Sequence, residues 1–292
     1  MKKENLFVHV HIPKCGGTTF QKILKKNFGT GFRRVEGTIE GKKPLDLKKL
    51  IENDPKITCL SSHRLSLNLP SKVNNKKVIT IAFVRNPVDR LISVLNTGQK
   101  NHECPEFKNY RLKEFIEEAL INKKAPQVIN FEIKYLTNLE GKKAIEKIES
   151  LMQNGQTFVF PLERFNEACV VLEKMFPEHF KNCVYARQNI SIKSKKITKK
   201  DREKTGGFMK DDFKLLEISN NFLDELIDRH FESKKEFERT IDKFEERLKS
   251  YQTEMAIKWF FKVVNPIYVI KHRKKIKPFI ERQYYNKIKK NE

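Results

Sequence analysis

Apolar runs that favour β-strands alternate with segments of helical spacing along most of the chain. Residues 6–12 and 78–84 are rich in Val, Ile and Phe, and the second run is typical of a strand buried on both faces of a parallel sheet. Shorter runs of the same kind occupy residues 56–60 and 156–160, and residues 19–28 have the spacing of a helix. This order predicts an α/β fold with a central, mostly parallel sheet flanked by helices.

A short polar loop separates the first predicted strand from the first predicted helix. Gly16 and Gly17 lack a Cβ atom, so main-chain N–H groups can approach an anion at the start of the helix. Thr18 and Thr19 add hydroxyl donors, and Lys14 adds a positive charge before the glycines. In the common phosphate loop of ATPases the lysine follows the glycines, so this loop omits the usual arrangement for magnesium and sets Lys14 beside a bridging ester oxygen. The alternative is an ordinary strand–turn–helix junction.

A second motif follows the predicted strand at residues 78–84. Arg85 stands at the carboxyl end of this strand, where open α/β sheets bind ligands. Asn86 is a good N-cap and a proline is well placed at the first helical position, so a helix is predicted to begin here. Ser93 on that helix and the guanidinium of Arg85 suit a terminal phosphate. The alternative is that Arg85 pairs with Asp89 one turn on.

Together the two motifs resemble those of sulfotransferases that use 3'-phosphoadenosine-5'-phosphosulfate (PAPS), specifically the carbohydrate branch that includes the heparan sulfate 2-O-sulfotransferases and bacterial relatives. The resemblance implies a P-loop-type sulfotransferase fold. It also implies that residues 13–19, Cys15 included, bind the 5'-phosphosulfate and that Arg85 and Ser93 bind the 3'-phosphate. Weaker matches, which extend the resemblance over residues 6–237, are residues 162–165 and 220–224.

The same resemblance assigns catalytic roles to two residues. Lys14 stabilises the negative charge that builds on the leaving oxygen. His63 follows the predicted strand at residues 56–60, in a position similar to that of the family's catalytic histidine, and acts as the general base. His11, which is the histidine nearest the loop, is the alternative base. Arg187 is a third phosphate ligand or a solvated arginine, and no metal is required.

Composition narrows the range of functions. The chain has 292 residues and a formal net charge of +23, which indicates an anionic partner or a lysine-rich surface. Its five cysteines are odd in number and form no C-x-x-C pair, so neither a zinc site nor a disulfide framework is indicated. A reducing compartment is the simplest interpretation. Because the first strand is predicted to begin within six residues of the N-terminus, we expect no signal peptide and a cytoplasmic protein.

The C-terminal segment differs from the rest of the chain. Residues 1–240 are predicted to form the sulfotransferase domain, and residues 241–292 a basic helical extension with 14 Lys or Arg and 6 Asp or Glu. Its Trp259 precedes two phenylalanines and a basic run at residues 271–275. The apolar stretch at residues 255–264 is too short and too charged to span a bilayer. The extension either lies on an anionic membrane surface, here the inner face, or packs on the catalytic domain or on a second subunit in a homodimer.

Two classes of function are consistent with the sequence. The first is a sulfotransferase that moves the sulfuryl group of PAPS to a hydroxyl of a carbohydrate or glycolipid acceptor and releases 3'-phosphoadenosine-5'-phosphate (PAP). The second is a non-enzymatic protein that binds nucleic acid or another polyanion and whose loop holds a structural anion. The absence of a recognised nucleic-acid motif disfavours the second class. Residues 33–43 and 96–110 are candidate acceptor-binding segments.

Overall fold

A six-stranded sheet forms the centre of the protein, as a computed structural model of residues 4–35, 45–96, 112–122, 124–186 and 198–263 describes it. The strands run in the order β2-β3-β1-β5, all parallel, and β6 continues the parallel sheet beside β5. Only β4 is antiparallel, at the start of β5. This architecture confirms the predicted α/β class with a mostly parallel sheet. The strands are β1 (Asn5–Val10), β2 (Phe32–Val35), β3 (Cys59–Ser62), β4 (Lys72–Val73), β5 (Lys76–Val84) and β6 (Thr157–Pro161).

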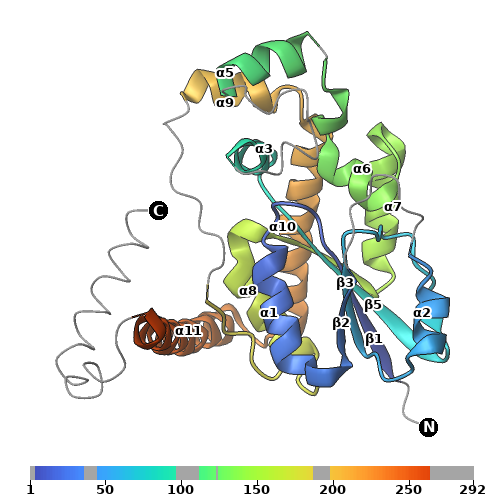
Figure 1. Cartoon of the computed structure of the whole chain (residues 1–292), viewed down its shortest axis with the longest axis vertical. Helices are drawn as coiled ribbons and strands as arrows, with labels where there is room; N and C mark the ends of the chain where they lie inside the picture. Colours follow the sequence, from blue (N-terminus) through green and yellow to red (C-terminus); the bar gives the residue numbers. More distant parts are fainter. Residues whose placement is uncertain (1–3, 36–44, 97–111, 123, 187–197, 264–292) are drawn as a thin grey trace.

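The helices cover both faces of this sheet. Figure 1 shows α1 and α8 on one side of the sheet, α2 and α7 on the other, and α10 beside α8. The α-helices are α1 (Gly17–Phe28), α2 (Leu47–Asn53), α3 (Pro87–Leu95), α5 (Leu112–Phe115), α6 (Phe131–Thr137), α7 (Gly141–Gln153), α8 (Phe165–Met175), α9 (Lys199–Gly206), α10 (Lys210–His230) and α11 (Lys234–Val263). Short turns of other helix types are η1 (Gly29–Gly31), η3 (Ile116–Ile121), η4 (Pro126–Val128) and η5 (Leu162–Arg164).

The central strands are apolar because helices cover both of their faces. In β1 every residue after Asn5 is buried, and β5 is buried along most of its length. Two polar residues of β1 and β3 face each other within this core, since His9 is the register partner of Ser61. An apolar central strand with a few paired polar groups is what a parallel sheet covered on both faces requires.

The order of the strands places three strand ends side by side. The chain leaves β1 through α1 towards β2 at one edge, whereas it leaves β5 through α3 towards β6 on the other side. The carboxyl ends of β3, β1 and β5 are therefore neighbours at the point where the winding direction changes. Open α/β sheets bind their ligands at such a point.

Most predicted elements agree with the structure. The helix expected after Asn86 is α3, with Pro87 in its first turn and with the Asn86 side chain accepting the amide N–H of Val88 and Asp89. The strand predicted at residues 56–60 begins instead at Cys59. The correction has a local cause: the Ile57 amide donates to the Asp54 carbonyl in a turn, which delays entry into the sheet.

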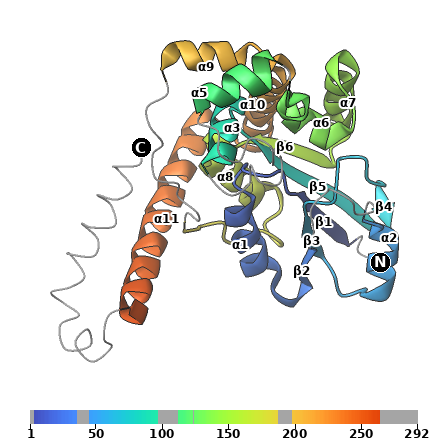
Figure 2. The same cartoon turned by 45° about the horizontal axis from the view of Figure 1, so that its top comes forward.

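The helix α11 packs on α8, and Figure 2 shows it running beside the α/β core. It buries Phe244, Leu248 and Ala256 against the rest of the protein. The domain boundary predicted at residue 240 falls inside this continuous helix. Residues 264–292, with the basic run at 271–275, lie outside the described residues, as do the side chains of residues 259–263, so the membrane and dimer alternatives stay predictions.

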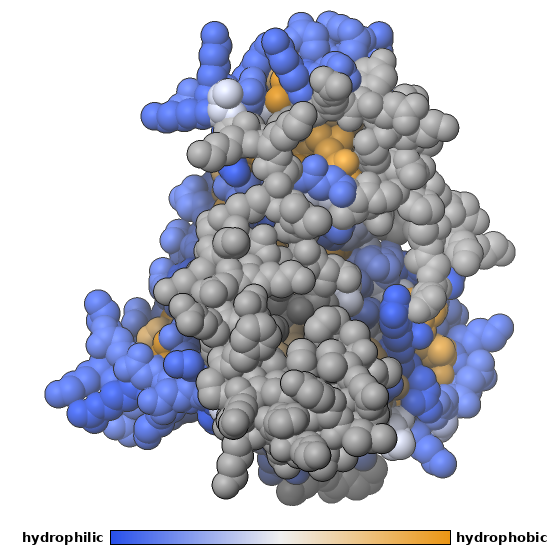
Figure 3. All heavy atoms as spheres, turned by 60° about the vertical axis from the view of Figure 1, so that its left-hand side comes forward, coloured by the Kyte–Doolittle hydropathy of each residue, from blue (hydrophilic) through white to orange (hydrophobic). Residues whose placement is uncertain are grey.

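The described surface is rich in polar and charged side chains. Figure 3 shows a face on which the described surface residues are mostly hydrophilic, as expected for a chain with 33% charged residues. Four cysteines are buried free thiols, and Cys104 lies outside the described residues. In the part of the chain that the structure describes, no helix combines the length and the apolar character that crossing a membrane would need.

Candidate active site

The predicted loop leaves β1 and turns into α1 through an unusual backbone. Lys14 and Gly16 both have left-handed backbone torsions, with φ of 68° and 74°. Glycine adopts this conformation without cost, whereas Lys14 is strained in it, and strain of this kind gathers at functional sites. Gly17 is required for another reason: a Cβ atom here would lie 1.9 Å from Cδ2 of His11. The loop therefore wraps closely around the end of its own strand.

The second motif meets this loop directly. Arg85 directly follows β5, and its Nη1 donates to the carbonyl of Lys14 at 3.3 Å. The sequence left open an ion pair between Arg85 and Asp89. In the structure, the Asp89 carboxylate instead pairs with Arg202, whose Nη2 donates to it at 2.5 Å. Ser93 lies on the second turn of α3 and faces the same space as the loop. Two segments that are seventy residues apart in the chain thus form one surface.

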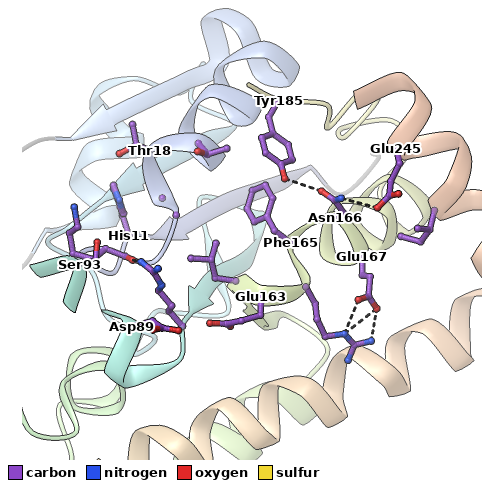
Figure 4. A pocket seen from close by; sticks show the side chains of 18 of the residues that line it. His11, Thr18, Asp89, Ser93, Glu163, Phe165, Asn166, Glu167, Tyr185 and Glu245 are labelled. Carbon is purple, nitrogen blue, oxygen red and sulfur yellow. Dashed lines mark hydrogen bonds and ion pairs between the residues drawn. The ribbon is translucent and has the colours of Figure 1, made fainter. Parts of the chain in front are cut away.

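A cavity of about 970 Å³ opens over this surface. The loop, the β5–α3 junction and His11 line one end of it, and α8, Tyr185 and α11 line the other (Figure 4). Cys15 is not among the lining residues, because its side chain is buried behind the loop and its thiol donates to Glu132 at 3.6 Å. Arg187 lies outside the described residues. The predicted residues that do line the cavity are Pro13, Lys14, Gly16, Gly17, Thr18, Thr19, His63, Arg85 and Ser93, together with the alternative base His11.

Three histidine rings form a column beside the loop. The ring of His11 stacks on that of His63 with centroids 3.8 Å apart, and on that of His9 at 5.2 Å. The Nδ1–H of His63 donates to the carbonyl of His11 at 2.6 Å, so in the neutral ring Nε2 is the nitrogen that carries no proton. The Tyr135 hydroxyl donates towards the carbonyl oxygens of both His11 and His63.

The two buried histidines of the column are held neutral. Nδ1 of His11 accepts from the side-chain amide of Gln21 at 3.2 Å, and that amide also donates to Ser61 at 2.9 Å. Burial, then the neighbouring rings of His9 and His63, hold the pKa of His11 far below its ordinary value. Burial also lowers the pKa of His9 to about 3. A ring that resists protonation this strongly is a poor general base.

The other end of the cavity was not found from the sequence. The Tyr185 hydroxyl donates to Oδ1 of Asn166 at 2.9 Å, and Nδ2 of Asn166 donates to Glu245 at 3.2 Å. The ring of Tyr185 stands edge-on to that of Phe165, with centroids 4.9 Å apart. Residues 162–165 were singled out in the sequence, but nothing local marks the other members. Four carboxylates of this wall line the cavity: Glu167, Glu238, Asp242 and Glu245. Glu163 also lines it, but at the β5–α3 junction, where its carboxylate accepts the backbone N–H of Asn86 at 2.7 Å.

The arrangement can bind an elongated anion. Positive charge, hydroxyls and the N-terminus of α1 gather at one end of the cavity. Aromatic rings and acceptor oxygens stand at the other end, where they suit an uncharged group with hydrogen-bond donors. Among the described residues, no cluster of His, Cys, Asp or Glu has the geometry to hold a metal ion.

Comparison with known proteins identifies the family of this chain. The sequence model of the Sulfotransferase family matches residues 1–219. A protein from Archaeoglobus fulgidus, described only as uncharacterized, is 28% identical over 190 residues, which cover 60% of this chain and 74% of the relative.

A solved sulfotransferase from Alicyclobacillus acidocaldarius overlaps 74% of this chain and 95% of its own, with a TM-score of 0.39 and 13% sequence identity. A likeness this distant carries no argument about function. The family match does, because it spans three quarters of the sequence and includes both of the motifs that meet in the cavity. The chain belongs to the sulfotransferase family.

Proposed function

We propose that this protein transfers the sulfuryl group of PAPS to a hydroxyl of a carbohydrate or glycolipid acceptor and releases PAP. The observation that carries this proposal is the meeting of the two phosphate-directed segments in one cavity next to His63. The cavity volume of about 970 Å³ is within the range of small-molecule sites. Its two kinds of lining fit a nucleotide with two separated phosphates and an uncharged base.

The loop and α3 hold the two charged ends of the donor. Lys14, Thr18 and Thr19 contact the 5'-phosphosulfate together with the first amides of α1. Arg85 and Ser93 contact the 3'-phosphate, which orients the donor without taking part in the chemistry. The nucleoside then extends towards Phe165 and Tyr185, as the second end of the cavity allows.

His63 is the general base in this proposal, and His11 is not. The carbonyl of His11 fixes the tautomer of His63, so that Nε2 of His63 can take the proton. His11 itself accepts a hydrogen bond at Nδ1 and is buried in a setting that opposes its charged form. A base for an acceptor hydroxyl must gain a proton during the reaction, and only His63 is set up to do so.

The chain supplies three contributions to the transfer. His63 removes the hydroxyl proton as the acceptor oxygen forms its bond to sulfur. Lys14 and the loop amides stabilise the negative charge on the phosphate oxygen as its bond to sulfur breaks. Arg85 and Ser93 keep the attacking and leaving oxygens in line by fixing the far end of the donor. The proton ends on His63 and the electron pair on the released PAP.

A transfer assay with labelled PAPS tests the proposal. The full-length protein is incubated with ³⁵S-labelled PAPS and a panel of neutral and anionic oligosaccharides and glycolipids, and both labelled product and PAP are measured. We expect label in at least one acceptor, dependent on His63, with PAP formed in equal amount. If no acceptor is labelled and the protein instead binds duplex DNA with a steep salt dependence, the polyanion-binding alternative replaces the enzyme.

A further inference from the structure

Glu132 is a buried carboxyl behind the phosphate-binding loop that the proposed chemistry does not use. It is the second residue of α6 and is 1% exposed, so it does not line the cavity. Isolated carboxylates are seldom buried to this degree, because removing the charge from water is costly. Its position therefore calls for a role that an apolar residue of similar size could not fill.

One oxygen of Glu132 joins the two phosphate-binding segments. Oε2 accepts the backbone N–H of Arg85 at 2.8 Å and the thiol of Cys15 at 3.6 Å. Cys15 belongs to the loop after β1, and Arg85 is the first residue after β5. A third contact joins the two segments directly, because Nη1 of Arg85 donates to the carbonyl of Lys14. The segments for the 5'- and 3'-phosphates are thus tied together on both sides.

Charged groups from two further elements hold Glu132 in place. Arg90 of α3 is 2% exposed, donates from Nε to the carbonyl of Pro13 at 3.2 Å, and lies over the ring of Phe131. Asp212 of α10 accepts the backbone N–H groups of Glu132 and Ile133 at 3.1 and 2.9 Å. These contacts fix the start of α6, and with it the direction in which Glu132 points.

The second oxygen of Glu132 has no hydrogen-bond partner among the described residues, although it is buried. Burial, and then the nearby Asp212 carboxylate, raise the pKa of Glu132, while Arg90 and the Arg85 amide oppose the rise. The carboxyl is therefore biased towards its neutral form. Asp212 shares this environment, and burial raises its pKa to about 6. A neutral carboxyl still accepts two donors at Oε2, which is the contact that matters for the two segments.

We propose that Glu132 is a positioning residue that sets the spacing between the 5'- and 3'-phosphate subsites. The proposal rests on the proposed function, because it assumes that the loop and Arg85 bind the two phosphates of one nucleotide. A ligand with both phosphates needs the two segments at one fixed separation. A ligand with a single phosphate can adjust to either segment alone, and so it does not depend on that separation.

The test compares nucleotides with one and two phosphates on matched variants. Calorimetry gives dissociation constants for PAP, 5'-AMP and 3'-AMP with the wild type, Glu132→Gln, Glu132→Asp and Glu132→Leu. The glutamine keeps an acceptor oxygen of the same length and is neutral. The aspartate is one methylene too short to reach the Arg85 amide, and the leucine has no acceptor. Thr137→Val serves as the control, because Thr137 is buried in the same helix and its hydroxyl, among the described residues, bonds only to Ile133 and Leu139.

We expect Glu132→Asp and Glu132→Leu to weaken PAP binding about ten-fold or more, which is ~1.4 kcal/mol, while both monophosphates change less than about three-fold. Glu132→Gln and Thr137→Val should bind all three ligands nearly as the wild type does. Should the leucine variant fail to fold, the aspartate and glutamine variants decide the question.

Two results separate the possible failures. If the wild type binds no PAP, the proposed function is wrong. If the wild type binds PAP but Glu132→Asp loses affinity equally for all three ligands, or loses none, the spacing role is wrong and Glu132 only stabilises α6. A thermal melt of each variant identifies the second case, because a purely structural loss lowers the melting temperature without favouring the monophosphates.

Discussion

The two ends of the cavity are opposite in character and in origin. The phosphate end is built by short continuous segments, the loop around Lys14 and the junction around Arg85, and carries positive charge. The far end is built by side chains from α8, Tyr185 and α11, and carries carboxylates (Figure 4). Asn166 and Glu245, which are hydrogen-bonded there, are 79 residues apart in the chain. Anion binding therefore depends on local backbone geometry, whereas the far wall depends on how distant helices pack.

This difference ranks the expected effects of substitution. Groups at the phosphate end act on the reacting atoms or on full charges, and their loss should be large. In the proposed binding mode, groups at the far end contact only an uncharged part of the donor, so their loss should be small. Substitutions at the phosphate end should therefore have larger effects than substitutions at the far end.

His63→Ala should have the largest effect. Removing a general base lowers turnover about 100- to 10,000-fold, while PAP affinity should stay nearly unchanged because the imidazole faces the acceptor. Steady-state kinetics with labelled PAPS measure the first quantity and calorimetry the second. His11→Gln is the companion variant. An inactive His11→Gln beside an active His63→Ala would move the base to His11.

Lys14→Ala should follow. Loss of one preorganised charge contact to the leaving oxygen costs about 2.7 to 4 kcal/mol of transition-state stabilisation, or ~100- to 1000-fold in turnover. PAP binding should weaken far less, because PAP lacks the transferred group. Lys22→Ala, on the exposed face of α1, controls for the change in net charge. Near-normal turnover in Lys14→Ala would remove Lys14 from the mechanism.

Arg85→Ala should discriminate between two ligands. The guanidinium is assigned to the 3'-phosphate, and a charge-assisted contact contributes about 1.5 to 3 kcal/mol. PAP should therefore weaken at least ~10-fold more than adenosine 5'-phosphosulfate, which lacks the 3'-phosphate. Competitive binding against labelled PAP measures both constants. Equal losses for the two ligands would mean that Arg85 acts on the shape of the loop through Lys14 and not on the 3'-phosphate.

Asn166→Ala should have the smallest effect at a cavity residue. A neutral hydrogen bond contributes about 0.5 to 1.5 kcal/mol, so PAP affinity should fall ~2- to 10-fold. Adenosine 5'-phosphosulfate should weaken by the same factor, because both ligands carry the nucleoside. Glu246→Ala, an exposed change next to Glu245 on α11, is the control. A loss larger than that of Arg85→Ala would overturn the contrast between the two ends.

The same contrast explains what the sequence could predict. The loop and the β5–α3 junction could be predicted from the sequence, because their geometry requires particular residues. Gly16 has a positive φ, Gly17 leaves space for the ring of His11, and Asn86 caps α3. These requirements fall on neighbouring residues and leave a pattern. The buried runs of β1 and β5 predicted the sheet for the same reason, since helices cover both faces of each strand.

The rest depends on long-range packing that leaves no local pattern. Glu132 is an unremarkable acid in the sequence, and only the fold brings it to Arg85 and Cys15. The pocket-facing residues of α11 have helical spacing, but this spacing does not tell which neighbour they face. The start of β3 was also misplaced, because residues 54–57 form a turn, in which the Ile57 amide donates to the Asp54 carbonyl, before the chain joins the sheet.

One titration tests the central claim that the cavity binds a nucleotide with two phosphates. The full-length protein is titrated calorimetrically with PAP at two salt concentrations, beside a parallel titration with duplex DNA, and both are repeated with Arg85→Ala. We predict saturable binding of one PAP per chain that weakens at least ~10-fold in the variant. Absence of PAP binding, together with DNA binding that falls steeply with salt and ignores Arg85→Ala, would contradict the account.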